Sequence, residues 1–152
     1  MTSTEFLSDS PAATEAFAAQ WAQNLQADTA ILLEGDLGAG KTTFIRGLAR
    51  GLGITEPIRS PTFTLIHEYT IQQPPHLQGL PFFHIDLYRI ETPEQIRTLG
   101  LDELFERMGI TAIEWAERLR LLGVPLPTRW VYTVCLFPEG EAQRRITVHE
   151  SQ

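Results

Sequence analysis

The feature that most constrains this chain is a glycine-rich stretch, Gly35–Thr42, which reads GDLGAGKT. It matches the pattern G-x-x-x-x-G-K-[ST], the spacing of a P-loop. Glycines allow positive φ and let the backbone pass close to a ligand, so that successive N–H groups form a nest for an anion. The lysine of the pattern reaches the outer phosphates of a nucleotide, and the following hydroxyl ligates Mg²⁺. The stretch is therefore predicted to bind phosphate.

The segments on either side of this stretch suit a P-loop. Residues 29–34 form a short apolar run, which predicts a buried strand. Residues 43–52 place their apolar side chains on one face of a predicted helix that Gly53 ends. Lys41 is also the only lysine in the chain. The alternative interpretation is a glycine-rich turn that binds no ligand.

Length and charge limit the class of protein. At 152 residues, the chain fits a single domain over residues 1–152. Its net charge of −7 and lack of a basic stripe argue against a protein that grips DNA or RNA by itself. No apolar run has the length of a membrane span, and no secretion signal is expected. The single cysteine, Cys135, favours a reducing cytoplasm and is predicted to be an inert core residue.

Local patterns predict the remaining elements. Ser10 and Pro11 are predicted to cap and begin a helix, and Thr92 and Pro93 a second one that Gly100 ends. Alternation and apolar runs predict two β-hairpins, one with a long, mobile, proline-rich tip at Gln72–Pro81. The first hairpin is expected to pair strands at 62–70 and 82–88, and the second to pair strands at 129–137 and 144–149. A turn is expected at 101–105, a strand at 110–115 and a helix at 116–122.

Two acidic residues follow apolar runs, and the carboxyl ends of strands are where an open α/β sheet binds its ligand. Asp86 ends the run Phe82–Ile85 and is a candidate Walker B acid. Glu114 ends Ile110–Ile113 and is a candidate to bind Mg²⁺ or to orient the attacking water. The alternatives are that Asp86 caps a turn before Leu87 and that Glu114 forms a surface ion pair with Arg118.

The segment Ser60–Thr64 follows the predicted P-loop helix, where a nucleotide switch often lies. Hydroxyls of Thr62 or Thr64 are candidates to contact Mg²⁺ or the γ-phosphate. The alternative is that they are ordinary threonines at the entry to a strand. His84 is predicted to be a satisfied core or rim residue rather than a base.

Taken together, Gly35–Thr43, Ser60–Leu65, His84–Arg89 and Glu114–Trp115 resemble the bacterial TsaE (YjeE) family in order and spacing. This family comprises the ATPases of tRNA threonylcarbamoyladenosine biosynthesis. The resemblance implies an α/β fold, a P-loop NTPase three-layer sandwich with a mixed parallel and antiparallel sheet. It also implies ATP and Mg²⁺ as cofactors, and action with the TsaD and TsaB proteins, so that tRNA is contacted only indirectly through the complex.

The resemblance also assigns roles to individual residues. Lys41, Asp86, Glu114 and Thr62 are the predicted catalytic residues, and Thr42, Glu114 and Asp86 the predicted metal ligands. The predicted nucleotide-binding residues are Gly38, Ala39, Gly40, Lys41, Thr42, Thr43, Trp115, Ser10 and Pro11. The long Gln72–Pro81 tip and Ala116, where proline is frequent, depart from the family pattern. The two rival functions are a small-molecule kinase and a non-catalytic, nucleotide-gated scaffold.

Overall fold

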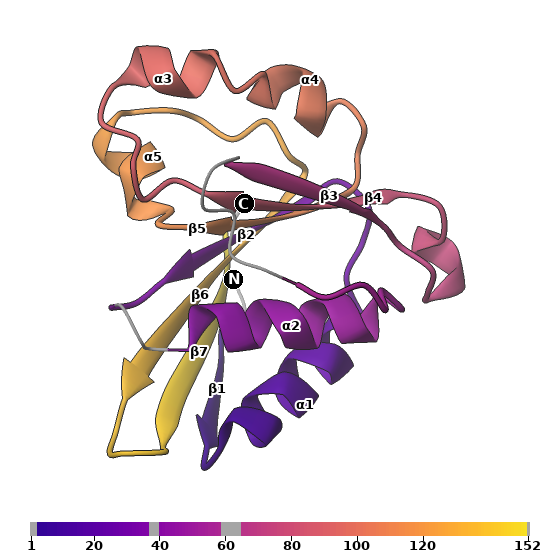
Figure 1. The fold of residues 1–152 in the computed structure, drawn as a ribbon, viewed down its shortest axis with the longest axis vertical. Helices are drawn as coiled ribbons and strands as arrows, with labels where there is room; N and C mark the ends of the chain where they lie inside the picture. The colour runs from indigo at the N-terminus through magenta and orange to yellow at the C-terminus, as the bar shows by residue number, and fades with distance from the viewer. Residues whose placement is uncertain (1–2, 37–39, 59–64, 152) are drawn as a thin grey trace.

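The fold is built on one seven-stranded sheet with the strand order β1-β7-β6-β2-β5-β4-β3 (Figure 1). The structure is a computed structural model, and it describes residues 3–36, 40–58 and 65–151. The strands are β1 (Ser3–Ser8), β2 (Thr29–Glu34), β3 (Ile66–Thr70), β4 (Pro81–Asp86), β5 (Ile110–Glu114), β6 (Trp130–Pro138) and β7 (Arg144–Ser151). The helices are α1 (Pro11–Ala22), α2 (Lys41–Gly51), α3 (Pro93–Arg97), α4 (Leu101–Phe105) and α5 (Glu117–Leu121), with a 3₁₀ turn η1 (Pro75–Leu77).

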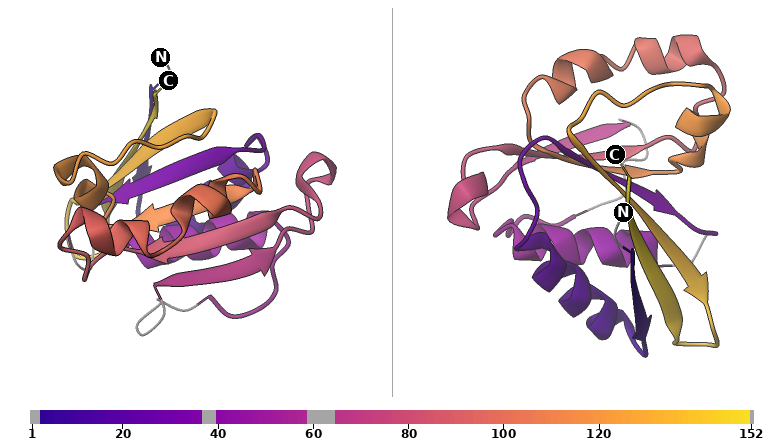
Figure 2. Two further views of the ribbon diagram at one scale, coloured as in Figure 1. Left: turned by 90° about the horizontal axis from the view of Figure 1, so that it is seen from above. Right: turned by 180° about the vertical axis from the view of Figure 1, so that it is seen from behind.

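The sheet is mixed, as expected. β2 pairs in parallel with both β5 and β6, and β4 pairs in parallel with β5. The remaining pairs, β1 with β7, β6 with β7 and β3 with β4, are antiparallel. Helices α1 and α2 cover one face, and α3, α4 and α5 lie over the other (Figures 1 and 2). The three-layer α/β sandwich is therefore confirmed, with β2 in its middle.

Each face of the sheet has its own apolar core. The core on the side of α1 and α2 includes Phe44, Leu48 and Leu52, which the helical pattern predicted to face inward. The core on the other side is centred on Ile85 and Ile113. Because both faces of the central strands are covered, β2 reads as a continuous apolar run rather than an alternating one.

Helices α1 and α2 pack unusually closely. A Cβ added at Gly47 would lie 2.4 Å from the carbonyl oxygen of Glu15, and one at Gly51 would lie 2.4 Å from that of Ala19. Glycine is therefore required where α2 crosses α1. At its start, α1 is capped by the Ser10 side chain, which accepts a hydrogen bond from the Ala13 amide, as the sequence predicted.

Both predicted hairpins form, but the tip of the β3–β4 hairpin differs from the expectation of mobility. Leu77 of η1 is fully buried in the core. Nε2 of the His76 ring lies 2.7 Å from the carbonyl oxygen of Leu25. The backbone N–H of Gln72 donates a hydrogen bond to the carbonyl oxygen of Leu52. The tip is held against α1 and α2 because its apolar side chain completes their core. β3 begins at Ile66, and the expected strand residues 62–64 lie outside the described part of the chain.

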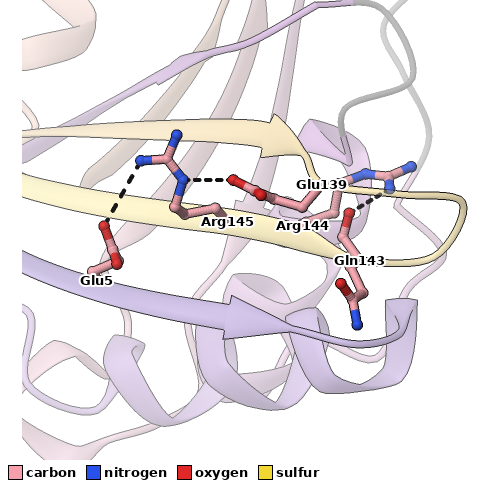
Figure 3. Close-up of polar contacts among 5 residues, drawn as sticks. All are labelled: Glu5, Glu139, Gln143, Arg144 and Arg145. Atoms are coloured by element: carbon pink, nitrogen blue, oxygen red, sulfur yellow. Dashed lines mark hydrogen bonds and ion pairs between the residues drawn. The ribbon is translucent and has the colours of Figure 1, made fainter.

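The edge strand β1 was not predicted. It pairs with β7 from Ser3 opposite His149 to Ser8 opposite Arg144. Figure 3 shows Arg145 of β7 between Glu5 and Glu139, with its Nε 2.7 Å from Glu139 Oε1. Only one residue of β1 is fully buried, so this strand has no buried apolar run by which the sequence could have predicted it. Its position brings the start of α1 to the edge of the sheet where β6 turns into β7.

The short helices on the other face follow their sequence signals. Thr92 and Gln95 form a reciprocal capping box at the start of α3, and Gly100, with φ of 70°, separates α3 from α4. Among the residues described, no helix has both the length and the apolar composition needed to cross a bilayer.

Candidate functional site

The site is centred on Lys41, the first residue of α2. Gly40, with φ of 102°, turns the chain from the loop into the helix. The Lys41 side chain folds back, so that its Nζ donates a 2.7 Å hydrogen bond to the Gly35 carbonyl. The same Nζ lies 3.8 Å from the centre of the Trp115 ring. The ammonium group is thus fixed between the strand end and an aromatic ring.

The charge of Lys41 lacks a carboxylate partner within the described ranges. The residue is only 5% exposed, and no ion pair joins its Nζ to an Asp or Glu of those ranges. Buried lysines are rare unless they are paired with an anion. A hydrogen bond to a carbonyl and a ring face offset only part of the cost of burying the charge. The arrangement therefore suits an anionic ligand.

The two candidate acids lie side by side. Asp86 ends β4 and Glu114 ends β5, and the register pairs these residues directly. The register also pairs Glu114 with Leu33 of β2, so Glu114 is on the strand next to the one that leads into the P-loop. Asp86 is one strand farther away. Both acids therefore end their strands at the carboxyl edge of the sheet, the edge from which the predicted P-loop leads to Lys41.

Glu114 is held by a histidine rather than by an arginine. It is 5% exposed, and its Oε2 lies 2.6 Å from Nε2 of His84, which is fully buried. The alternative ion pair with Arg118 does not form, because the Arg118 guanidinium donates instead to the carbonyl oxygen of Tyr88. His84 is a core residue, as predicted, but the sequence analysis did not find its contact with Glu114. The signal was present: His84 and Asp86 are two apart on one strand and so share a face.

Asp86 has a structural contact as well as a place at the site. Its Oδ1 accepts a 2.9 Å hydrogen bond from the backbone amide of Tyr88, so Asp86 caps the turn, as the alternative interpretation predicted. Burial raises the pKa of the Asp86 carboxyl, and the nearby charge of Glu114 raises it further, against the opposing effect of the Tyr88 hydrogen bond. A cation between the two carboxylates would relieve this repulsion.

Trp115 covers the site through an unusual backbone conformation. It follows Glu114 with φ of 60°, a left-handed conformation that bulky residues rarely adopt. This turn brings its ring over Lys41, while the ring of Tyr88 packs on it with centroids 4.9 Å apart. Trp115 therefore contacts the lysine of the predicted loop in addition to packing on Tyr88.

The other predicted residues are distributed unevenly. Thr42 and Thr43 lie in the first turn of α2 beside Lys41. Ser10 and Pro11 begin α1 after β1, which is three strands from β2 in the sheet, and the Ser10 hydroxyl is used as a helix cap. Three further candidates, Gly38, Ala39 and Thr62, lie outside the described residues.

The residues present fit a magnesium nucleotide better than a bare metal ion. Within the described ranges, no cluster of three or more His, Cys, Asp or Glu side chains is arranged to hold a metal alone. P-loop proteins hold Mg²⁺ with one hydroxyl, one or two carboxylates and the phosphates of the nucleotide. Thr42, Glu114 and Asp86 could supply these protein groups, and Lys41 could supply the matching positive charge.

Comparisons with known proteins give one consistent result. Residues 8–146 match the family model described as threonylcarbamoyl adenosine biosynthesis protein TsaE. The chain is 45% identical to a TsaE protein of Nostoc over 130 residues, which are 82% of this chain and 74% of the relative. It is 42% identical to the Bacillus subtilis TsaE protein over 138 residues, 90% and 79% of the two chains. The crystal structure of Bacillus subtilis YdiB superposes with a TM-score of 0.74 at 33% identity, covering 97% of this chain and 84% of that one.

Proposed function

The chain belongs to the TsaE family, whose members are named for tRNA threonylcarbamoyladenosine biosynthesis, and on this premise we propose that it is an ATPase of that pathway. It binds ATP with Mg²⁺ and hydrolyses it slowly when alone. It acts with the TsaD and TsaB proteins, in the cytoplasm, and supports repeated turnover of the modification of the adenosine beside the anticodon. The chain does not transfer the threonylcarbamoyl group itself.

The observation that carries this proposal is the buried ammonium of Lys41 at the start of α2, which forms no ion pair with a carboxylate of the described residues. A helix N-terminus already favours an anion, because its first N–H groups are unpaired and its dipole is positive there. Lys41 adds a full positive charge there, with its Nζ 2.7 Å from the carbonyl oxygen of Gly35, the first residue after β2. Triphosphate is the anion that this combination, within a G-x-x-x-x-G-K-[ST] sequence, suits best.

The roles proposed for individual residues follow the P-loop pattern and the family resemblance. Backbone N–H groups of Gly38, Ala39 and Gly40 cradle the phosphates, and Lys41 neutralises them. Thr42 and Glu114 hold Mg²⁺, with Asp86 as the Walker B acid beside them. Magnesium, when bound, neutralises charge on the phosphate oxygens.

A second group of residues surrounds the nucleotide. Trp115 shields the phosphates from water, and Thr43 continues the binding loop into α2. Thr62 senses the γ-phosphate from the segment after α2. Ser10 and Pro11, at the start of α1, approach the base.

The chain alone is expected to be a slow enzyme. Phosphoryl transfer relies mainly on positioning and on stabilisation of charge, and an arginine from a partner often completes such a site. Two arginines that follow Glu114 in the chain are already engaged: Arg118 bonds to a backbone carbonyl, and Arg120 pairs with Glu34 at 2.8 Å. The net charge of −7 also argues that tRNA reaches the complex through the partner proteins.

The direct test is nucleotide binding by a Lys41→Ala variant, measured by isothermal titration calorimetry. Charge-assisted hydrogen bonds contribute about 1.5–3 kcal/mol each, so affinity for ATP is expected to fall at least about tenfold. Arg46→Ala is the matched control, because it removes one positive charge from an exposed position of the same helix. Equal affinity of the parent and Lys41→Ala proteins, or normal ATPase turnover in Lys41→Ala, would refute the assignment.

Reconstitution separates the proposal from its rivals. TsaD, TsaB, tRNA and threonylcarbamoyl-adenylate are combined with and without this chain. Multiple turnovers that need both the chain and hydrolysable ATP support the proposed role. Full support by a non-hydrolysable analogue indicates a scaffold instead, and transfer of labelled γ-phosphate to a small metabolite indicates a kinase.

A further inference from the structure

We propose that His84 is the positioning residue for Glu114, fixing which carboxylate oxygen faces the magnesium nucleotide. The inference rests on the proposed function, because it concerns the same site. His84 has no role in the proposed function, and the inference gives it one.

The first step is the geometry of the two strands. His84 pairs in register with Ala112 on β5, and Asp86 pairs with Glu114 two residues later. All four therefore lie on the same face of the sheet. Ala112 has only a methyl group, which leaves room for the imidazole to extend along this face to Glu114. The contact that results is 2.6 Å long, between Nε2 and Oε2.

The second step is the set of partners of each group. His84 is fully buried and Glu114 nearly so. In the described part of the chain, the His84 Nδ1 atom makes no hydrogen bond, and Glu114 forms no ion pair with an arginine or lysine. Among the described residues, the imidazole therefore makes its one hydrogen bond with this carboxylate. A neutral imidazole has one N–H, and Nε2 is the nitrogen whose proton has an acceptor.

The third step is the consequence for the carboxylate. A strong hydrogen bond to Oε2 restricts rotation of the Glu114 side chain and leaves Oε1 as the free oxygen. Such outer partners orient the groups that hold a metal, and their loss typically weakens metal binding about 10- to 100-fold. Without His84, Glu114 remains in a buried position but loses the donor that fixes its orientation.

Two substitutions distinguish a donor at the right place from a merely polar residue. In His84→Gln, the amide nitrogen occupies about the position of Nε2 and can still donate to Glu114. In His84→Asn, the amide nitrogen is at the position of Nδ1, which has no partner, and falls short of the carboxylate. Both replacements are polar and smaller than histidine, but Asn is smaller than Gln by one methylene group, so the double-substitution cycle below is needed to separate loss of packing from loss of the donor.

The measurement is the dissociation constant of Mn²⁺ from the protein saturated with a non-hydrolysable ATP analogue, followed by the EPR signal of free Mn²⁺. His84→Asn is expected to raise this constant about 10- to 100-fold, and His84→Gln to keep it within about threefold of the parent. Affinity for the analogue in EDTA, measured by calorimetry, is expected to be unchanged in both. His67→Gln is the matched control, because His67 is the register partner of His84 on β3, and it is expected to leave the constant unaltered.

A double-substitution cycle tests whether His84 acts through Glu114. In a Glu114→Gln background, adding His84→Asn should change the Mn²⁺ constant by less than about twofold. Equal Mn²⁺ binding by the parent and His84→Asn, equal loss in His84→Gln and His84→Asn, or additive losses in the cycle would each overturn the proposal while leaving the nucleotide site intact. Failure of the parent protein to bind the analogue at all would instead refute the proposed function.

Discussion

Replacing Gly47 with alanine tests the packing that holds α2, the helix after the predicted phosphate loop, in place. An alanine Cβ there would lie 2.4 Å from the Glu15 carbonyl oxygen, 2.7 Å from the Ala18 Cβ and 2.8 Å from the Glu15 Cα. Two of these contacts are with backbone, which cannot rotate away. Because a normal contact needs roughly 3.5 Å, α2 must move away from α1 by about 1 Å.

The expected free-energy change combines two opposing effects. Alanine is favoured over glycine inside a helix by about 1 kcal/mol. Overpacking of a close contact costs about 1–3 kcal/mol, and the upper end applies here because the obstacle is backbone. The free energy of unfolding should therefore fall by about 2 kcal/mol, which lowers Tm by about 4–8 °C for a chain of this size.

The assay is urea and thermal unfolding of Gly47→Ala beside the parent protein. Arg46→Ala is the control on the exposed side of the same helix, and it should change the free energy of unfolding by no more than about 0.5 kcal/mol. A Gly47→Ala protein as stable as the parent, or more stable, would show that helix propensity outweighs the close approach of α1 and α2, and the packing argument would fail.

Three further predictions concern charged groups and the thiol. Glu114→Gln should slow ATP hydrolysis by at least about tenfold in a single-turnover assay while Tm stays close to that of the parent; unchanged hydrolysis would remove Glu114 from the site. The exposed Arg107 side chain lowers the pKa of Glu68 through two 2.8 Å hydrogen bonds, so the folded state gains stability above pH 4.5 and loses it as the pH falls through the lowered pKa. Glu68→Gln should therefore cost about 0.5 kcal/mol at pH 7 and progressively less as the pH falls below 4.5, measured by urea unfolding, whereas a cost independent of pH would contradict the ion pair. Cys135 is half-buried rather than in the core, and desolvation together with the charge of Glu34 raises the pKa of its thiol, so alkylation by iodoacetamide at pH 8 should be slower than that of a free thiol; faster reaction would contradict this.

The local elements could be predicted because their signals are short. The caps at Ser10 and Thr92, the helix after the P-loop and the strand that ends at Glu114 each depend on residues within about one turn or one strand of each other. Burial and capping act over this range regardless of the rest of the chain. The same holds for the phosphate loop, whose spacing names its ligand before any tertiary structure is known.

Other features depended on partners far along the chain. β1 is one, because its polar sequence forms a strand only where β7 offers an edge. The packed tip of the β3–β4 hairpin is another, because Leu77 is buried only where α1 and α2 provide the core. Proline and polar composition favoured a mobile tip, and the tertiary contact outweighed this local tendency.

By itself, then, the sequence determined the elements other than β1, the glycine-rich loop of P-loop spacing and the two carboxylates at strand ends. Only the tertiary structure decided that β5 lies next to β2, that Lys41 is buried without a carboxylate in the described ranges, and that His84 holds Glu114. The physical reason is that periodicity tells which face of a strand a side chain occupies. Periodicity does not tell which strand lies beside a given strand, because the order of the strands depends on how the helices and the whole sheet bury their apolar faces together.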